Sequence, residues 1–274
     1  MTAGTLVTEG AGSGHRPVID VNSDVGEGFG SWRMGPDEEL LRLVSSANVA
    51  CGFHGGDPSW MRRTCDTAVR HGVAIGAHVG FPDLAGFGRR HLEMSGTELT
   101  DAVLYQLGAL DAFARSSGDR VRYLKPHGAL YHAAAQREDQ AAAVVAALLE
   151  FDSGLAVVGP PGSQLLAVAS AAGLAIAAEG FADRAYGPDG RLVPRSQPGS
   201  VLSDLDAVAR QTVALATGGA AAGELGPGLL PGAVTTVCVH SDTPGAERVA
   251  RAVRAALEAA GITVAAFSAG PAAP

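Results

Sequence analysis

The sequence predicts a closed (β/α) barrel of the TIM type, formed by one domain. Three observations favour this α/β fold. Short apolar segments alternate with helical segments along most of the 274 residues, as in parallel strands joined by right-handed helical crossovers. The apolar segments are continuous, which is typical of strands covered on both faces. Seven or eight such units are more than an open doubly wound sheet, the alternative fold, usually contains.

The expected strands are eight apolar runs, each followed by polar residues and then by a helical pattern. They cover residues 18–21, 47–50, 73–77, 121–124, 155–158, 174–178, 235–239 and 263–267. Strands of this kind, each followed by a helix, form the inner wall of a barrel.

The expected helices begin at recognisable capping residues. Asp57 is followed by a proline at the first helical position, and this helix ends at Gly72. Ser95 and Glu98 form a capping-box pattern before the helix expected over 99–114. These signals fix where the helices between the early strands begin.

The later helices are predicted by composition. Residues 139–149 and 206–216 are rich in alanine and helical by propensity. A last helix is expected to begin at Pro244 and to end near Gly261. Each lies between two expected strands, as the barrel requires.

The barrel domain is expected over residues 17–268, with flexible tails at 1–16 and 269–274. One stretch, 153–178, carries no charge and is long enough to span a bilayer. A Gly-Pro-Pro-Gly sequence at 159–162 interrupts it, and a helix would break there. We therefore interpret the stretch as strand, turn, helix and strand, and expect no membrane segment.

Composition and charge argue against several classes of protein. The 28 acidic residues exceed the 20 basic ones, for a net charge of −8. This balance disfavours a nucleic-acid-binding protein and electrostatic docking on anionic membranes. The three cysteines form no CxxC pair, so neither a disulfide framework nor a zinc knuckle is indicated. A reducing, cytoplasmic location is the expectation.

Polar side chains follow the expected strands, where the loops of a parallel barrel converge on one rim. The residues are Asp20, Asn22, Asp24, Glu27, His54, Asp57, His78, Asp83, Arg89, Arg90, Lys125, His127, Glu179, Asp183, Arg184, His240 and Asp242. Catalytic sites of such barrels lie on this rim. The convergence of acids, histidines and bases from separate segments indicates an enzyme.

Three polar residues alternate along the first strand. Asp20, Asn22 and Asp24 share one face of an extended segment. Inside a barrel such a face costs free energy unless its groups are paired or bound to metal. The alternative is a hydrogen-bonded turn before Gly26. At least one of these acids is expected to be functional, because buried carboxylates tend to mark sites.

Three histidines, His54, His78 and His127, follow three different strands. With Asp24 they could form a metal site, because imidazole and carboxylate suit zinc and related ions. They could equally act as general acids and bases, since the ordinary histidine pKa is near neutrality. Lys125 and His127 are two residues apart and share a face. The sequence leaves both roles open.

Several motifs bear on cofactors and anions. The Gly55-Gly56 pair could place backbone N–H groups against an anion at a helix N-terminus. Arg89, Arg90, Arg184 and Arg195 could bind carboxylate or phosphate, although surface ion pairs are the simpler reading of any one arginine. The sequence has no P-loop, no nucleophile elbow and no complete dinucleotide-binding motif, so neither nicotinamide nor flavin is expected.

Long motifs in one order resemble the lactam-utilisation family (LamB/YcsF). The resemblance extends from about residue 18 to 267 of the 274. The motifs are DVNSDVGE at 20–27, SANVACGFHGGDP at 46–58, GAH at 76–78, PDLAGFGRR at 82–90, KPHGALY at 125–131, FADRAY at 181–186, LVPR at 192–195 and VHSDTPG at 239–245.

The resemblance implies a barrel similar to those of glycoside hydrolases and polysaccharide deacetylases, TIM-like or distorted with seven strands. It implies the role of the A subunit of a prokaryotic 5-oxoprolinase, which opens the lactam of 5-oxo-L-proline to L-glutamate. ATP, with Mg²⁺, is the implied cofactor, and separate B and C subunits are the implied partners. The chain could also form a homo-oligomer.

With the resemblance, the candidate residues take expected roles. Asp24 or Glu27, together with His54, would perform acid–base chemistry, and Lys125 and His127 would contact the developing oxyanion. The expected substrate-binding residues are Asn22, Asn48, His78, Arg89, Arg90, Asp183, Arg184 and His240.

Two alternatives stay open. One is a stand-alone metal-dependent hydrolase or deacetylase, with Asp24, His54 and His127 as ligands. The other is a substrate-binding subunit without chemistry of its own, since ATP could bind to the partners.

Overall fold

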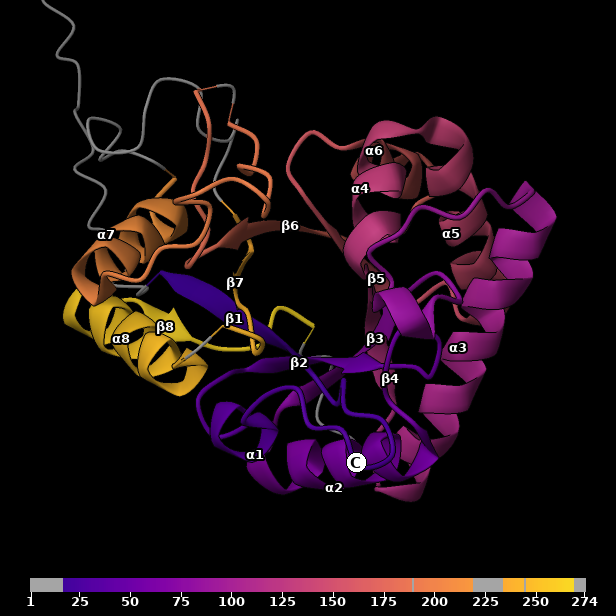
Figure 1. Cartoon of the computed structure of the whole chain (residues 1–274), viewed down its shortest axis with the longest axis horizontal. Coiled ribbons are helices and arrows are strands. Elements are labelled where there is room, and N and C mark those ends of the chain that lie inside the picture. The colour runs from indigo at the N-terminus through magenta and orange to yellow at the C-terminus, as the bar shows by residue number, and fades with distance from the viewer. Residues whose placement is uncertain (1–16, 189, 219–233, 244, 269–274) are drawn as a thin grey trace, which may run out of the picture.

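Seven parallel strands close into a barrel in the computed structural model, which describes residues 17–188, 190–218, 234–243 and 245–268 (Figure 1). The strands are β1 (Val18–Val25), β2 (Ser46–Ala50), β3 (Ala74–Val79), β4 (Val121–Pro126), β5 (Ala156–Gly159), β6 (Ile176–Phe181) and β7 (Thr236–Val239). Each pairs with its neighbour in chain order, and β1 pairs with both β2 and β7. The predicted barrel is therefore confirmed.

The closure is formed at the first strand. Asn22 pairs with Ser46 of β2, and Asp20 pairs with Thr236 of β7. An eighth strand, β8 (Thr263–Val264), pairs with the start of β1 alone among the described strands and stays outside the ring of seven. The sequence predicted a longer eighth run, over 263–267, than the two residues that form this strand.

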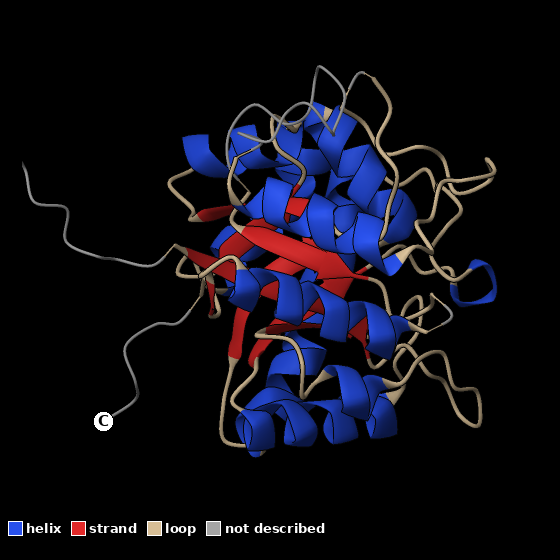
Figure 2. Ribbon diagram, turned by 90° about the vertical axis from the view of Figure 1, so that its left-hand side faces the viewer, coloured by secondary structure: helices blue, strands red, loops and turns tan. Residues whose placement is uncertain are grey.

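Helices surround the strands in Figure 1, and in Figure 2 the strands lie inside a layer of helices. The helices are α1 (Asp37–Leu40), α2 (Pro58–His71), α3 (Gly96–Ser116), α4 (Gly128–Gln136), α5 (Glu138–Phe151), α6 (Gln164–Ala171), α7 (Leu205–Ala216) and α8 (Ala246–Ala259), with a 3₁₀ turn η1 (Leu84–Gly86). In the described chain, no helix is both long and apolar enough to cross a bilayer.

The predicted caps are present. The Asp57 carboxylate accepts hydrogen bonds from the amides of Ser59 and Trp60, and Gly72 ends α2 in the left-handed region at φ +67°. Ser95 and Glu98 form the reciprocal capping box of α3. These contacts satisfy backbone groups that the first and last helical turns would otherwise leave unpaired.

Some boundaries differ from the sequence-based expectation. The short helix α4 was not predicted. The helix α8 begins at Ala246, and Pro244 lies outside the described residues, as do the expected tails at 1–16 and 269–274. The uncharged stretch 153–178 contains β5, α6 and the start of β6, as predicted.

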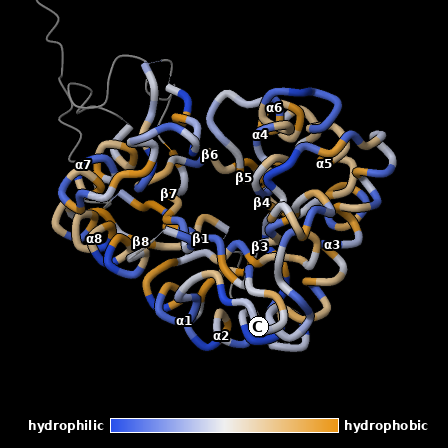
Figure 3. Tube along the Cα trace, in the orientation of Figure 1, coloured by the Kyte–Doolittle hydropathy of each residue, from blue (hydrophilic) through white to orange (hydrophobic). Residues whose placement is uncertain are grey.

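The apolar core lies mainly between the strands and the helices. Val21, Val49 and Ile75 are fully buried there, with Leu107 of α3. Figure 3 shows hydrophobic positions along the strands and on helix faces, with hydrophilic positions on outer turns. The barrel interior is different, because polar residues of β1, β2, β4 and β6 meet inside it. That interior forms the floor of the candidate site.

Candidate active site

A fully paired polar group fills the centre of the barrel. We call it the barrel-centre network: Asn22, Asp24, Asn48, Lys125 and Glu179. Asn48 donates to Asn22 Oδ1 at 2.7 Å and to Asp24 Oδ1 at 2.8 Å, and Asn22 donates to Glu179 Oε1 at 3.0 Å. The Asn48 contacts join the neighbouring strands β1 and β2, whereas Asn22 and Glu179 lie on β1 and β6, which are not neighbours in the barrel wall, so this contact crosses the interior.

Lys125 is the only lysine of the chain, and it lies in this network. Its Nζ is 2.7 Å from Glu179 Oε1, 3.0 Å from Asp24 Oδ1 and 3.2 Å from Cys238 Sγ. Burial alone would lower the pKa of Lys125, but Asp24, Cys238 and Glu179 together raise it well above its ordinary value. The ammonium ion is therefore held between two carboxylates.

The same arrangement sets the charge of Asp24. Burial would raise the pKa of this carboxyl, but His78 and Lys125 outweigh burial and lower it well below its ordinary range. Its Oδ2 is 3.4 Å from His78 Nε2. Asp24 is thus an ionised carboxylate at the floor of the pocket described below.

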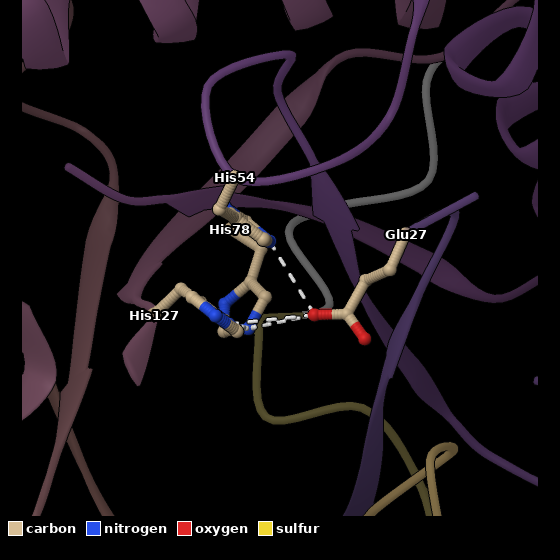
Figure 4. Close-up of side chains that lie close together, drawn as sticks. All are labelled: Glu27, His54, His78 and His127. Atoms are coloured by element: carbon tan, nitrogen blue, oxygen red, sulfur yellow. Dashed lines mark hydrogen bonds and ion pairs between the residues drawn. The ribbon is translucent and has the colours of Figure 1, made fainter. Parts of the chain in front are cut away.

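Beside the network lies a second polar group, which we call the histidine cluster: Glu27, His54, His78 and His127. Figure 4 shows Glu27 directing one carboxylate oxygen towards the imidazoles. Glu27 Oε1 is 3.3 Å from His54 Nε2, 3.3 Å from His127 Nδ1 and 3.9 Å from His78 Nε2. One ligand atom from each residue lies within 4.8 Å of the others.

The cluster is buried and tightly packed. The rings of His54 and His127 stack with centroids 3.7 Å apart, and His78 meets both edge-on. Burial, with the neighbouring histidines, lowers the pKa of His54 and of His127 well below its ordinary value. Burial likewise raises the pKa of Glu27. Among the described residues, Glu27 Oε1 and both ring nitrogens of His54 find no hydrogen-bond partner.

A pocket of about 560 Å³, counting its open mouth, covers both groups. Eight predicted site residues line it: Asp24, Glu27, His78, Arg89, Lys125, His127, Arg184 and His240. Phe87 and Phe181 supply apolar surface beside them. Most of the predicted residues thus converge on one cavity at the carboxyl ends of the strands.

Arginines stand at the mouth of this pocket. Asp242 accepts from Arg89 Nη2 at 2.5 Å and from Arg195 Nη1 at 3.2 Å. One carboxylate faces two guanidinium groups, so this trio carries one surplus positive charge. We call Arg89, Arg195 and Asp242 the arginine rim.

Two other predicted residues, Asp183 and Arg184, hold neighbouring parts of the pocket wall in place through hydrogen bonds. Asp183 accepts from His240 Nδ1 at 2.9 Å, and its pKa is lowered because His240 and Thr243 outweigh its burial. Arg184 lines the pocket, but its guanidinium donates to the backbone carbonyls of Ser200 and Val193. These contacts fix the long loop that follows β6.

Five predicted site residues do not line the pocket: Asn22, Asn48, His54, Arg90 and Asp183. Asn22 and Asn48 lie in the barrel-centre network. Arg90 pairs with Asp83, whose Oδ1 accepts from its Nε at 2.9 Å. His54 lies against His127 and is 1% exposed, so it meets the pocket only through its neighbours.

Two further expectations can be compared with the geometry. The metal-ligand set suggested from the sequence combined His54 and His127 with Asp24, but the structure groups these histidines with Glu27 and His78. The Gly55-Gly56 turn does not present an anion site at α2, because the Gly56 amide donates to Gly28 and Asp57 caps the helix.

Three residues of the site were given no catalytic or substrate-binding role from the sequence. Glu179 pairs with Lys125, Tyr131 donates to Glu179 Oε2 at 2.9 Å, and Arg195 completes the arginine rim. Glu179 was expected on the rim as a charge directly after an apolar strand, and Arg195 as one of several guanidinium groups on long loops. Tyr131 was noted only as part of a motif.

The chain is similar to known proteins over nearly its whole length. The LamB/YcsF family model matches residues 19–271. A protein of Nocardia farcinica, named as the A subunit of 5-oxoprolinase, is 58% identical, over 91% of this chain and 99% of that protein. A protein of Streptomyces griseus with the same name is 53% identical, over 92% and 100%.

Solved structures agree. The lactam utilization protein of Thermus thermophilus superposes with a TM-score of 0.83 at 45% identity, covering 91% of this chain and 99% of that one. A putative cellobiose-phosphate cleavage protein of Enterococcus faecalis shares only the fold, with a TM-score of 0.55 at 13% identity, over 92% and 97%. From the family match and these relatives, the chain belongs to the LamB/YcsF family.

Proposed function

We propose that the chain is the A subunit of an ATP-dependent 5-oxoprolinase, which opens the lactam of 5-oxo-L-proline to L-glutamate together with B and C subunits. One observation carries the proposal: relatives named as the A subunit of 5-oxoprolinase match at 53–58% identity over 99–100% of their own length. The pocket supports it, because its chemistry suits a small cyclic amide with a carboxylate.

The arginine rim suits the carboxylate of 5-oxoproline. Arg89 and Arg195 share Asp242, and guanidinium groups bind carboxylates through paired N–H donors. The apolar faces of Phe87 and Phe181 suit the methylene carbons of the ring. The lactam carbonyl would then face the floor of the pocket, where Asp24 lies.

Asp24 is the best candidate for the base that activates water. Its carboxylate is ionised beside His78 and Lys125, and Asp24 lines the pocket. Glu27 faces three imidazoles, so it is less free to act. Lys125 could reach an oxyanion only by leaving one of its present partners.

ATP gives the amide carbon its reactivity. Transfer of the γ-phosphoryl group to the lactam oxygen makes the adjacent carbon electrophilic. One water adds to that carbon and the C–N bond breaks, which frees the amine and leaves an acyl phosphate; a second water then hydrolyses the acyl phosphate to the carboxylate and inorganic phosphate. The sequence has no P-loop, so we assign the nucleotide and its Mg²⁺ to a site completed by the B and C subunits.

The test is glutamate release from 5-oxoproline and ATP, by this chain alone and mixed with its B and C subunits. We expect activity only in the full mixture. Asp24→Asn should lower kcat/KM by about 100- to 10,000-fold in that mixture, because a positioned base contributes this much. The control Asp101→Asn changes an exposed acid of α3 and should leave activity unchanged.

Two results would count against the proposal. Full activity of folded Asp24→Asn would remove Asp24 from the mechanism. No glutamate release by verified, folded subunits would reject the oxoprolinase activity itself. Circular dichroism of each variant separates loss of chemistry from loss of folding.

A further inference from the structure

Hydrogen bonds to backbone carbonyls fix the tautomers of two histidines in the histidine cluster. His78 Nδ1 lies 3.0 Å from the carbonyl oxygen of Lys125, and His127 Nε2 lies 2.8 Å from that of Phe87. A carbonyl oxygen only accepts, so each of these ring nitrogens carries the proton. The other nitrogen of each neutral ring is then an acceptor.

Those two acceptor nitrogens face each other. His78 Nε2 and His127 Nδ1 are 3.0 Å apart, with no hydrogen to share when both rings are neutral. Glu27 Oε1, a further acceptor, lies 3.3 Å from the same His127 nitrogen. Lone pairs that converge without a donor repel one another, and burial prevents water from relieving the repulsion.

His54 adds a buried ring whose tautomer is fixed by no hydrogen bond from the described residues. It is 1% exposed, its ring nitrogens find no hydrogen-bond partner in the described part of the chain, and its Nε2 is 3.3 Å from Glu27 Oε1. Buried polar atoms without partners are rare in folded proteins and call for a missing partner. A cation bound in the cluster would supply such a partner, with the stacked His54 or His127 ring turning so that both lone pairs reach it.

We propose that His54, His78, His127 and Glu27 bind one divalent transition-metal ion, with Zn²⁺ the best match. Three imidazoles and a carboxylate are a ligand set that zinc favours. Ligands of a tetrahedral zinc ion lie about 3.3 Å apart, because each bond is about 2.0–2.1 Å long. Three distances between ligand atoms, of 3.0, 3.3 and 3.3 Å, are close to this value, and the distance of 3.9 Å between His78 Nε2 and Glu27 Oε1 is longer.

The surroundings support a metal ion at this place. The carbonyls of Lys125 and Phe87 orient the two rings through their other nitrogens, which is the usual support of a metal-binding histidine. The neighbouring group of Asp24, Cys238 and His240 offers ligand atoms too. There, Lys125 Nζ already contacts Asp24 and Cys238, so its positive charge would oppose a second cation.

The rival explanation of these acceptor contacts is an extra proton in the histidine cluster in place of a metal ion. A protonated Glu27 could donate to one imidazole, or a protonated His78 could donate from Nε2 to His127 Nδ1, and either would relieve one of the contacts. One proton would still leave the other acceptors without a donor. A metal site goes beyond the proposed function, since it depends only on the geometry of this chain.

Metal titration tests the site directly. The purified full chain is stripped with EDTA, freed of the chelator and titrated with ZnCl₂ by calorimetry, and with CoCl₂ by visible absorption. We expect one saturable equivalent of each ion and the absorption bands of four-coordinate Co²⁺. Zn²⁺ should also raise the Tm, because a ligand that binds only the folded chain stabilises it.

Variants identify the ligands. His78→Gln and His127→Gln should each weaken Zn²⁺ binding by about 100-fold or more, since loss of even an outer-shell partner costs 10–100-fold. Glu27→Gln tests the fourth ligand at nearly constant volume. The control His91→Gln removes a partly exposed histidine that pairs with Glu93, and should bind Zn²⁺ like the unchanged chain.

The outcomes are separable. Absence of saturable binding by the folded chain would overturn the metal site in favour of the proton, as would equal binding by the ligand variants and the control. The titration contains no lactam, no ATP and no B or C subunits. Its failure therefore leaves the proposed function standing, and failure of glutamate release leaves metal binding standing.

Discussion

The barrel-centre network and the histidine cluster lie next to each other inside the barrel, but their polar atoms are partnered very differently. In the network, the Lys125 ammonium contacts both Asp24 and Glu179, and Asn22, Asn48 and Tyr131 donate to other oxygens of the network. In the cluster, lone pairs of histidine and glutamate converge without a donor from the described residues. Both are buried, so burial alone does not explain the difference.

The contrast separates two uses of buried polar groups. A network in which every member is satisfied holds strands and charges in place, and in this chain it sets the ionisation of Asp24. A buried group with unsatisfied acceptor atoms lowers the free energy of unfolding unless a donor or a cation binds to those atoms. Stability measurements on single variants can therefore tell the two groups apart.

The largest effect is expected in the network. Lys125→Met leaves Asp24 and Glu179 buried without their cation, and should lower the free energy of unfolding by about 3–5 kcal/mol. Urea unfolding measures the change. The control Arg122→Met, also on β4, removes only a partly exposed pair with Asp119 and should cost no more than about 1 kcal/mol. A Lys125→Met chain within about 1 kcal/mol of the control would show that the network does not depend on its charge.

A smaller effect of opposite sign is expected in the cluster. In EDTA, Glu27→Gln replaces an unpartnered buried carboxylate oxygen with a group that can donate to imidazole lone pairs. The free energy of unfolding should rise by about 1–3 kcal/mol. With saturating Zn²⁺ the order should reverse, because the variant lacks a ligand. Destabilisation of the variant in EDTA would mean that the cluster is already satisfied without metal.

The smallest effect concerns Asp20, below the network. Burial raises its pKa to about 6, against hydrogen bonds from Ser46, Thr236 and Ser45 that lower it. The folded chain then binds more protons than the unfolded chain between the unfolded pKa of 3.8 and about 6. Stability from this group is present below that window and is lost as the pH rises through it.

Asp20→Asn removes this dependence. Relative to the unchanged chain, the variant should gain about 1 kcal/mol of unfolding free energy between pH 5 and pH 8. Urea unfolding at the two pH values measures the difference. A constant difference would show that Asp20 is ionised at both pH values in the folded chain.

The fold was predictable because its signals are local. Strands covered on both faces appear in the sequence as continuous apolar runs, such as residues 121–124. Asp57 and Ser95 mark the beginnings of α2 and α3, because their side chains cap these helices. The helix α4 was missed because His127, which precedes it, makes no capping hydrogen bond within the described chain. Local patterns cannot reveal a helix end that is held only by tertiary contacts.

The sequence predicted which residues lie near the site, but not which of them contact one another. Asp24, His78 and Lys125 follow strands, so their convergence could be expected from barrel geometry. The pairing of Asn22 with Glu179 joins residues 157 positions apart, and the stacking of His54 on His127 depends on how two loops fold back. Such contacts are set by side-chain reach across the barrel, which spacing along the sequence does not determine.

The solitary lysine has a practical consequence. Apart from the terminal amine, the chain has a single primary amine, and it is buried between two carboxylates. An amine-selective reagent can react with Lys125 only when its Nζ leaves Asp24 and Glu179. The rate of its modification, followed by mass spectrometry, would therefore report how often these contacts break. A single ¹³C-methyl label there would give one NMR signal that reports on the centre of the barrel.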